Sequence, residues 1–279
     1  MRTINLKDVT QKVRDLFIDA CENIPENVLN ALKNAVKEEE SPLGKQVLEQ
    51  IIENDILARE KHLPICQDTG VAVVYVTIGS EVCFEGDLYA AINEGVAMAY
   101  TEGYLRKSVV RHPLDRVNTK NNTPAIVHVK LVPGDIFKID VAPKGGGSEN
   151  MSTVKMLIPA DGIEGVKKLV VDTVFNGGGK PCPPIIVGVG IGGNFEKCAL
   201  LAKEALMREI DDKSEDPIAC KLEEDLKELI NNCGVGPMGF GGRVTCLAVK
   251  VNVHPCHIAS LPVAINIQCH AARHKSCTL

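Results

Sequence analysis

The sequence predicts a mixed α/β protein, with a helical N-terminal segment followed by a mixed sheet flanked by helices. Apolar residues recur at helical spacing through roughly the first sixty residues, and several later runs are rich in β-branched residues. Helical patterns alternate with those runs along the rest of the chain. Because no compositional linker divides the 279 residues, we expect one catalytic domain over residues 1–279.

The elements follow in order along the chain. Helices are expected at 6–20, from Pro25 onward and at 42–59, since proline suits the first turn of a helix. A β-branched run predicts a buried strand at 71–78, and Asp87 is placed to cap a helix that runs to about Arg106. Strands at 125–132 and 136–141 are joined across Pro133-Gly134-Asp135, as paired strands of a hairpin would be. The later patterns predict helices near 162–175, 194–209 and 217–231, and strands near 184–190, 243–253 and 262–268.

Composition excludes several classes of protein. The formal net charge of -5 argues against a nucleic-acid partner, which normally requires a basic face. The sequence shows no apolar stretch of about 18 residues, so we expect no membrane span. Residues 1–7 open an amphipathic helix and lack the apolar core of a signal peptide. We therefore expect a cytoplasmic protein whose eleven cysteines stay reduced, the odd count being a poor fit to a disulfide framework.

The run Gly188-Val189-Gly190-Ile191-Gly192-Gly193 matches the glycine pattern of dinucleotide-binding proteins. That pattern also requires a second strand after the following helix, ending in an acid that reaches the ribose. Here a second helix follows instead. Glycines that let a strand turn tightly into a helix explain the run more simply, and a helix start that helps to hold an anion is a further alternative.

Three cysteines, Cys66, Cys182 and Cys269, lie where an apolar run meets a turn or a polar group. Three thiolates from distant loops make an incomplete ligand set, which leaves a metal with an open, reactive position. Each position alone is also compatible with a buried structural cysteine beside a turn. The other eight cysteines lack such flanks and suit small core positions, although Cys256 differs from the rest in adjoining His257.

Other residues suggest an anionic substrate. Gln67 and Asp68 place an amide and a carboxylate directly after Cys66. The glycines of 144–150 leave backbone N–H groups free to approach a ligand. Arg106, at a helix end, suits a bidentate grip on a carboxylate, although for a lone arginine a solvated helix end is the simpler explanation. His257 lies between apolar segments and also fits a satisfied core histidine.

Taken together, five motifs carry a family resemblance. They are Pro64-Ile65-Cys66-Gln67-Asp68-Thr69-Gly70, Lys144-Gly145-Gly146-Gly147-Ser148-Glu149-Asn150, Lys180-Pro181-Cys182-Pro183-Pro184, His257-Ile258-Ala259-Ser260-Leu261-Pro262-Val263 and Gln268-Cys269-His270-Ala271-Ala272-Arg273. In this order they resemble the α subunit of the two-subunit, oxygen-sensitive class I fumarases and L-tartrate dehydratases. The resemblance covers nearly the whole chain, which would correspond to the N-terminal domain of single-chain members.

The resemblance implies a 4Fe-4S cluster with three cysteine ligands, Cys66, Cys182 and Cys269, and one open iron that acts as a Lewis acid. By the same resemblance Asp68 protonates the departing hydroxyl, and His257 hydrogen-bonds substrate or hydroxyl. The remaining residues implied for substrate binding are Gln67, Arg106, Gly145 and Gly146.

The resemblance also implies partners. A β subunit would carry the general base, a threonine, and further carboxylate-binding residues, so this chain would be active only with it, in a higher oligomer of αβ units. The substrate would be a small dicarboxylate. Hydration of fumarate to (S)-malate is the leading reaction, with L-tartrate dehydratase and mesaconate hydratase as alternatives.

Rival classes make different demands on the same residues. A non-catalytic, metal-stabilised structural subunit would use the three cysteines for stability alone. A zinc hydrolase would usually add His and carboxylate ligands to its zinc. A nucleotide-dependent oxidoreductase would need the strand that the glycine run lacks. Loss of activity with retention of the cluster on changing Asp68 to Asn distinguishes catalysis from the structural role.

Overall fold

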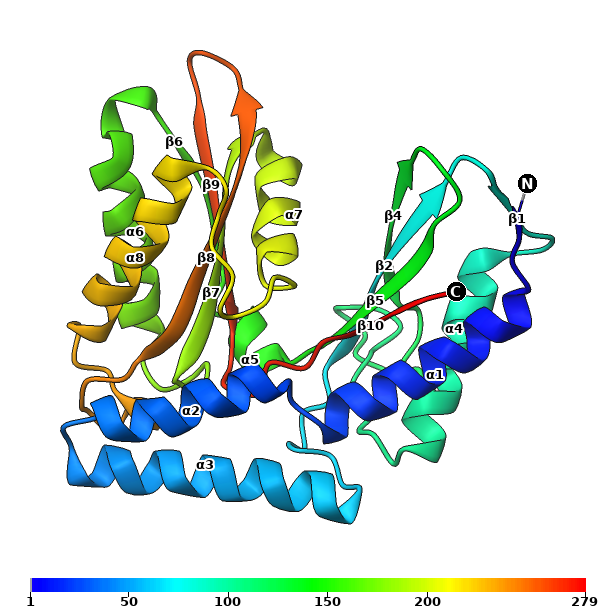
Figure 1. Cartoon of the computed structure of the whole chain (residues 1–279), viewed down its shortest axis with the longest axis horizontal. Coiled ribbons are helices and arrows are strands. Elements are labelled where there is room, and N and C mark those ends of the chain that lie inside the picture. The colour runs from blue at the N-terminus through cyan, green and yellow to red at the C-terminus, as the bar shows by residue number, and fades with distance from the viewer. Residues whose placement is uncertain (1) are drawn as a thin grey trace. The chain divides into compact units, whose positions relative to one another are not determined.

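The computed structural model describes residues 2–279, which form two compact units (Figure 1). Unit 1 combines the chain up to Pro25 with Asn54–Gly146 and Arg273–Leu279, and unit 2 combines Glu26–Glu53 with Gly147–Ala272. Each unit mixes helices with a four-stranded sheet, so the α/β class predicted from the sequence is confirmed. Among residues 2–279 the strands divide among three sheets, two of four strands and one of two strands, rather than joining in one. A single catalytic domain stays a prediction.

The helices of the described chain are α1 (Leu6–Glu22), α2 (Glu26–Glu38), α3 (Pro42–Lys61), α4 (Leu88–Glu102), α5 (Gly146–Glu149), α6 (Gly162–Gly177), α7 (Phe195–Ala205) and α8 (Pro217–Asn231). The strands are β1 (Arg2–Thr3), β2 (Val71–Gly79), β3 (Val82–Cys83), β4 (Ile126–Val132), β5 (Phe137–Lys144), β6 (Thr153–Leu157), β7 (Ile185–Gly193), β8 (Cys246–Cys256), β9 (Leu261–Gln268) and β10 (Lys275–Thr278). None of the helices in residues 2–279 is long and apolar enough to span a membrane.

Unit 1 is built on a sheet of strand order β10-β5-β2-β4. Helices α1 and α4 pack with the strands to form its apolar core. This core includes the fully buried Phe17, Tyr100 and Phe137. The two helices approach closely because α4 carries Gly95, where a Cβ atom would collide with the carbonyl oxygen of Thr10. Asp87 caps α4 as predicted, accepting a hydrogen bond of 3.0 Å from the Ala90 N–H.

The expected hairpin between β4 and β5 is wrong, because β2 lies between them. Strand β2 pairs parallel to β4 and antiparallel to β5. The connecting segment wraps the end of β2, where Gly79 donates a 2.7 Å hydrogen bond to the Ile136 carbonyl. Only glycine fits there, since a Cβ atom would overlap the backbone of Gly134. The turn sequence predicted a chain reversal correctly but could not identify the strand that it enclosed.

Unit 2 is built on a sheet of strand order β6-β9-β7-β8. Figure 1 shows α6 and α8 on one side of this sheet and α7 on the other. The core lies mainly under α6 and α8 and includes Val170, Leu226 and Ile265. After Ala272 the chain returns to unit 1, where Lys275–Thr278 forms the last strand, β10, antiparallel to β5.

The glycine run of β7 has a packing role. A Cβ atom at Gly188 or Gly190 would overlap the backbone carbonyls of Ala202 or Cys198, so both glycines let α7 lie directly on the strand. Gly192 and Gly193 have positive φ and bend the chain toward α7. Helix α8, and no strand, follows α7 among the described residues. The context that a dinucleotide site needs is absent there, as the sequence indicated.

Candidate functional site

The turn after Cys66 is held in place by buried groups of unit 1. Thr69 and Gly70 are buried, and the buried Tyr100 hydroxyl donates hydrogen bonds of 2.7 Å and 3.1 Å to their carbonyl oxygens. Gly70 has a φ of 73° and lies against the Lys144 carbonyl, where a Cβ atom would collide. Cys66 and Gln67 therefore remain exposed on a rigid turn, with Asp68 half-buried beside them.

The Asp68 carboxylate is held by backbone donors. Its Oδ1 atom accepts a 3.0 Å hydrogen bond from the Gly70 N–H, and its Oδ2 atom accepts a 2.8 Å bond from the Gly146 N–H. The Arg273 guanidinium donates a 2.6 Å bond to the Asp68 carbonyl oxygen. Gly145 leaves room for this contact, because a Cβ atom there would lie 3.1 Å from Asp68 Oδ2 and 3.2 Å from the Arg273 guanidinium.

Arg106 borders the same turn. Helix α4 ends at Glu102, earlier than the sequence predicted, and Gly103 caps it. The Thr69 hydroxyl donates a 3.0 Å hydrogen bond to the Arg106 carbonyl, while the Arg106 residue as a whole is exposed. Unit 1 thus brings Cys66, Gln67, Asp68, Arg106, Gly145 and Gly146 into one region.

In unit 2 the other two cysteine loops meet. Cys182 has a φ of 57°, and its N–H donates a 3.1 Å hydrogen bond to Gly179, which closes a tight turn. The His270 N–H, next to Cys269, donates a 3.4 Å bond to the Cys182 carbonyl. Both cysteine residues are half-buried. The proline residues on either side of Cys182 and its left-handed backbone make this loop stiff.

The chemistry of the three loop thiols suits metal ligation. Cys66 accepts a 3.4 Å hydrogen bond from the Asp68 N–H, and Cys269 accepts one of 3.4 Å from the Gln268 amide. Hydrogen bonds to the ligand sulfurs help to set the reduction potential of iron–sulfur clusters. By contrast, burial raises the pKa of the Cys21 and Cys246 thiols to about 12, which makes them inert. Within neither unit do three or more His, Cys, Asp or Glu side chains of residues 2–279 already form a metal-binding group.

His257 lies elsewhere in unit 2. It is exposed in the loop between β8 and β9, and its Nδ1 atom accepts a 3.1 Å hydrogen bond from the Ala259 N–H. In the neutral ring the proton then sits on Nε2, which can donate outward. Cys269 follows the opposite end of β9, about 26 Å away for eight strand residues. Unit 2 by itself does not bring His257 to the cysteine loops.

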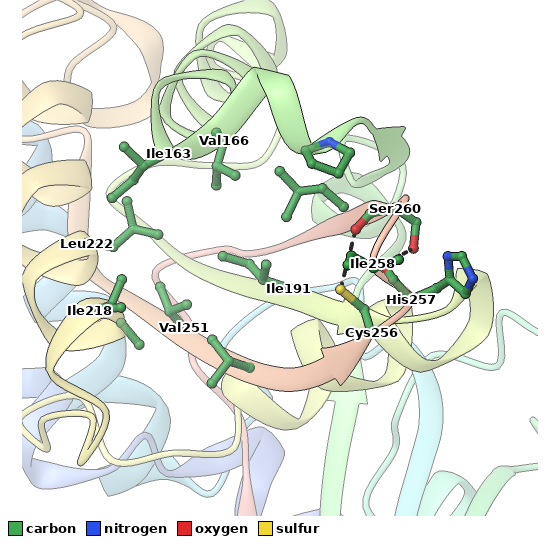
Figure 2. Close-up of a pocket in the computed structure, with 15 residues that line it drawn as sticks. Ile163, Val166, Ile191, Ile218, Leu222, Val251, Cys256, His257, Ile258 and Ser260 are labelled. Atoms are coloured by element: carbon green, nitrogen blue, oxygen red, sulfur yellow. Dashed lines mark hydrogen bonds between the residues drawn. The ribbon is translucent and has the colours of Figure 1, made fainter.

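A cavity of about 410 Å³ adjoins this loop, under the amino ends of α6 and α8 (Figure 2). Ile163, Ile218 and Leu222 line it from the helices, and the His257 ring points away from it. Carboxylates are costly to desolvate in an apolar cavity. The cavity is therefore unsuited to a dicarboxylate, and the polar turn around Asp68 remains the candidate site.

Sequence reasoning missed three supports of the site. They are Tyr100 beneath the turn, Asn122, whose amide donates a 3.1 Å bond to the Gly70 carbonyl, and Arg273. Arg273 stands in the fifth motif, where the sequence assigned it no role. The long sequence separation between Arg273 and Asp68 gave no local signal of their contact.

Unit 1 thus holds the Asp68 carboxylate by N–H donors beside the exposed thiol of Cys66. The model of the fumarate hydratase (Fumerase) family matches residues 10–278, and the chain belongs to this family. It is 45% identical to the putative L(+)-tartrate dehydratase subunit alpha of Methanocaldococcus jannaschii, over 95% of each chain. It is 32% identical to the L(+)-tartrate dehydratase subunit alpha of Escherichia coli K12, over 90% of this chain and 84% of the relative. Both reactions gain or lose water, so the family is one of hydro-lyases.

Proposed function

We propose that this chain is the α subunit of an iron–sulfur hydro-lyase that reversibly hydrates fumarate to (S)-malate. The observation that carries the proposal is the Asp68 carboxylate, whose two oxygens accept the N–H groups of Gly70 and Gly146. A carboxylic acid at this position, next to an exposed thiol, is suited to proton transfer at a substrate oxygen.

Cys66, Cys182 and Cys269 would hold a 4Fe-4S cluster with one open iron. The accessibility of the three thiols and the N–H···S hydrogen bonds to Cys66 and Cys269 support this assignment. When bound, the cluster would supply a Lewis acid that weakens the bond between carbon and a hydroxyl oxygen. The proposal places the enzyme in the cytoplasm, where thiols stay reduced.

The role of Asp68 follows from its surroundings. In dehydration, the carbon–oxygen bond breaks and the Asp68 proton passes to the departing hydroxyl, which leaves as water. A base removes the proton from the neighbouring carbon, and the double bond forms. The N–H groups of Gly70 and Gly146 stabilise the carboxylate that Asp68 then becomes. In hydration the same steps run in reverse.

The remaining predicted residues of unit 1 would bind the substrate. Arg106 is exposed at the rim, where a guanidinium can hold a substrate carboxylate through two hydrogen bonds. Gln67 and the backbone of Gly145 and Gly146 flank Asp68 and would fix the orientation of the substrate. His257 lies at the opposite end of β9 from Cys269, about 26 Å away for eight strand residues, so we assign it no contact with a substrate held at the cysteine loops.

A β subunit would complete the enzyme. The relatives in Methanocaldococcus jannaschii and Escherichia coli are named as alpha subunits, which supports a second subunit here. We assign to it the general base, a threonine, and further carboxylate-binding residues, and we expect higher oligomers of αβ units.

L(+)-tartrate is a second candidate substrate, favoured by the names of those relatives. Mesaconate hydration is a third. All three substrates pair a carboxylate with a carbon that gains or loses hydroxide, so the residues of this chain would serve each. Comparing kcat/KM for fumarate, L(+)-tartrate and mesaconate with the αβ complex ranks them.

Changing Asp68 to Asn tests the proposal. We expect kcat of the αβ complex to fall at least about 100-fold, because the acid that delivers the proton is lost. Iron and sulfide content should equal that of the wild type. Asp172→Asn, which removes an exposed carboxylate of α6, is the matched control and should leave kcat unchanged. Full activity of D68N with an intact cluster would remove Asp68 from the mechanism.

A further inference from the structure

A basic arm, residues 107–121, links α4 to β4 in unit 1. It carries four cations, Lys107, Arg111, Arg116 and Lys120, and one acid, Asp115, in a chain whose net charge is -5. Residues 111–118 are all exposed. The arm thus concentrates positive charge on an otherwise acidic chain, and no step of the proposed reaction uses it.

The arm is a fixed structure. The Arg111 N–H donates a 2.8 Å hydrogen bond to the Val117 carbonyl, and the Thr119 N–H donates a 2.9 Å hydrogen bond to the Val109 carbonyl. These two bonds make a short hairpin. Arg116 and Lys120 adopt positive φ, a conformation that costs free energy in non-glycine residues. An exposed segment that keeps such a shape is preorganised, and a preorganised surface loses less entropy on binding.

The base of the arm is tied to the candidate site. Asn122 is fully buried, and its Oδ1 atom accepts hydrogen bonds of 2.6 Å and 3.1 Å from the N–H groups of Ser108 and Val109. Its amide donates a 3.1 Å bond to the Gly70 carbonyl. Asn122 therefore ties both ends of the arm to Gly70, which is two residues after Asp68.

The exposed side chains are those of a protein interface. Leu114 at the tip is 87% exposed and Val117 is 43% exposed. Arginine is enriched at the cores of protein interfaces, and an exposed leucine gains free energy only against an apolar surface. A dicarboxylate would use the cations but would leave Leu114 and Val117 in water. A protein partner matches both features.

We propose that the basic arm docks the β subunit, on a surface that presents carboxylates around an apolar contact for Leu114. This inference rests on the proposed function, in which a second subunit brings a base to the substrate beside Asp68. A standard interface covers about 800 Å² of each partner, a disc of about 16 Å radius. Asn122, at the base of the arm, is hydrogen-bonded to Gly70, two residues after Asp68, and so lies well within such a disc centred on Asp68. A subunit that completes the site would therefore contact at least the base of the arm.

The test measures the dissociation constant between the purified α chain and its β subunit at about 50 mM and about 300 mM NaCl. R116E/K120E reverses two exposed charges and leaves Asn122 and Arg106 intact. L114S removes the apolar contact without changing charge. K33E/K37E, at two exposed positions of α2, is the control with the same change of charge. Circular dichroism confirms folding of each variant.

We expect R116E/K120E and L114S each to weaken β binding at least about 10-fold, and K33E/K37E to change it less than about 2-fold. The salt dependence of binding should shrink in R116E/K120E, and kcat at saturating β should match the wild type. Wild-type affinity of both arm variants would overturn the proposal. Unchanged affinity with a salt-sensitive loss of kcat/KM would assign the arm to steering the dicarboxylate instead. A wild-type complex that forms but shows no hydro-lyase activity would overturn the proposed function alone, because affinity is measured without turnover.

Discussion

At the scale of single residues, Asp55 of α3 is a carboxyl group that opposes folding at high pH. It is 3% exposed, and neither oxygen has a hydrogen-bond partner among residues 2–279. Burial raises the pKa of Asp55 from 3.8 to about 7, and the nearby Asn54 and Arg59 offset only part of that effect. Between pH 4 and 7 the folded chain therefore binds a proton that the unfolded chain releases, so stability falls as pH rises through this window.

Asp55→Asn should remove that penalty. We expect the variant to be more stable than the wild type by about 2–4 kcal/mol at pH 8, and to show no gain near pH 4, where both forms are neutral. Thermal or urea unfolding of the α chain at the two pH values measures the difference. Glu53→Gln, at an exposed position of the same helix, should show no such pH-dependent gain. An equal effect of D55N at both pH values would contradict the assigned ionisation.

Single residues also show where sequence reasoning stops. Cys66, Gln67 and Asp68 are adjacent, so their common location followed from the sequence. Arg273 reaches Asp68 only because β10 pairs with β5, which no local pattern encodes. His257 was expected near the other site residues, and the placement of β9 instead separates it from Cys269 within unit 2.

At the scale of elements, Glu39 fixes the end of α2 to the loop before β8. Its carboxylate accepts N–H groups from Ser41, Arg243 and Val244, and the residue is 1% exposed. Burial alone would raise the pKa of Glu39, but these backbone hydrogen bonds lower it overall. The stabilisation is therefore present above about pH 4.5 and is lost as pH falls through the lowered pKa.

Glu39→Gln should destabilise the chain by about 2–3 kcal/mol at pH 7, because an amide nitrogen cannot accept these N–H groups. The difference should narrow toward pH 4. Urea unfolding followed by circular dichroism measures it. Glu38→Gln, one residue earlier and exposed, controls for the loss of charge and should cost less than about 0.5 kcal/mol. Equal stability of E39Q and the wild type would show that the loop is held by other contacts.

The glycines of β7 give a second prediction about elements. Gly190→Ala should destabilise the chain by about 1–3 kcal/mol, since the added Cβ forces α7 away from the strand. Gly177→Ala, where a Cβ atom meets Met151 at an ordinary 3.6 Å, is the matched control and should be neutral. Chemical unfolding compares the two. A neutral G190A would show that α7 can move without cost.

Local patterns predicted elements better than their pairing. The helices at 6–20 and 42–59 and the strand at 71–78 appear close to their expected bounds, because amphipathic spacing and β-branched runs are local signals. The short strands β6 and β10 were missed, being held by neighbouring strands rather than by propensity. The position of β2 between β4 and β5 was missed for the same reason, since strand order depends on contacts between residues far apart in the sequence.

At the scale of the whole molecule, division into two units was not predictable from composition. The chain passes from unit 1 into unit 2 at Glu26 and returns to unit 1 after Glu53. Neither crossing is marked by a change in polarity or by a glycine-rich linker. The features that recur in both units are the cysteine loops, Cys66 in unit 1 and Cys182 and Cys269 in unit 2. Under the proposed function, activity depends on the cluster that those loops would bind and on the β subunit that would join this chain.

The α chain purified without oxygen should therefore contain about four irons with matching sulfide and give a three-iron paramagnetic signal after mild oxidation. It should hydrate fumarate at less than about 1% of the rate of the αβ complex, since removal of a general base alone costs about 100-fold or more. Cys182→Ser should lose iron, whereas Cys220→Ser, outside the three cysteine loops, should retain it. Activity should rise with added β subunit and saturate at equal amounts of the two chains. A normal rate from the α chain alone, with its cluster intact, would mean that its own residues include the base, and the division of labour between two subunits would be wrong.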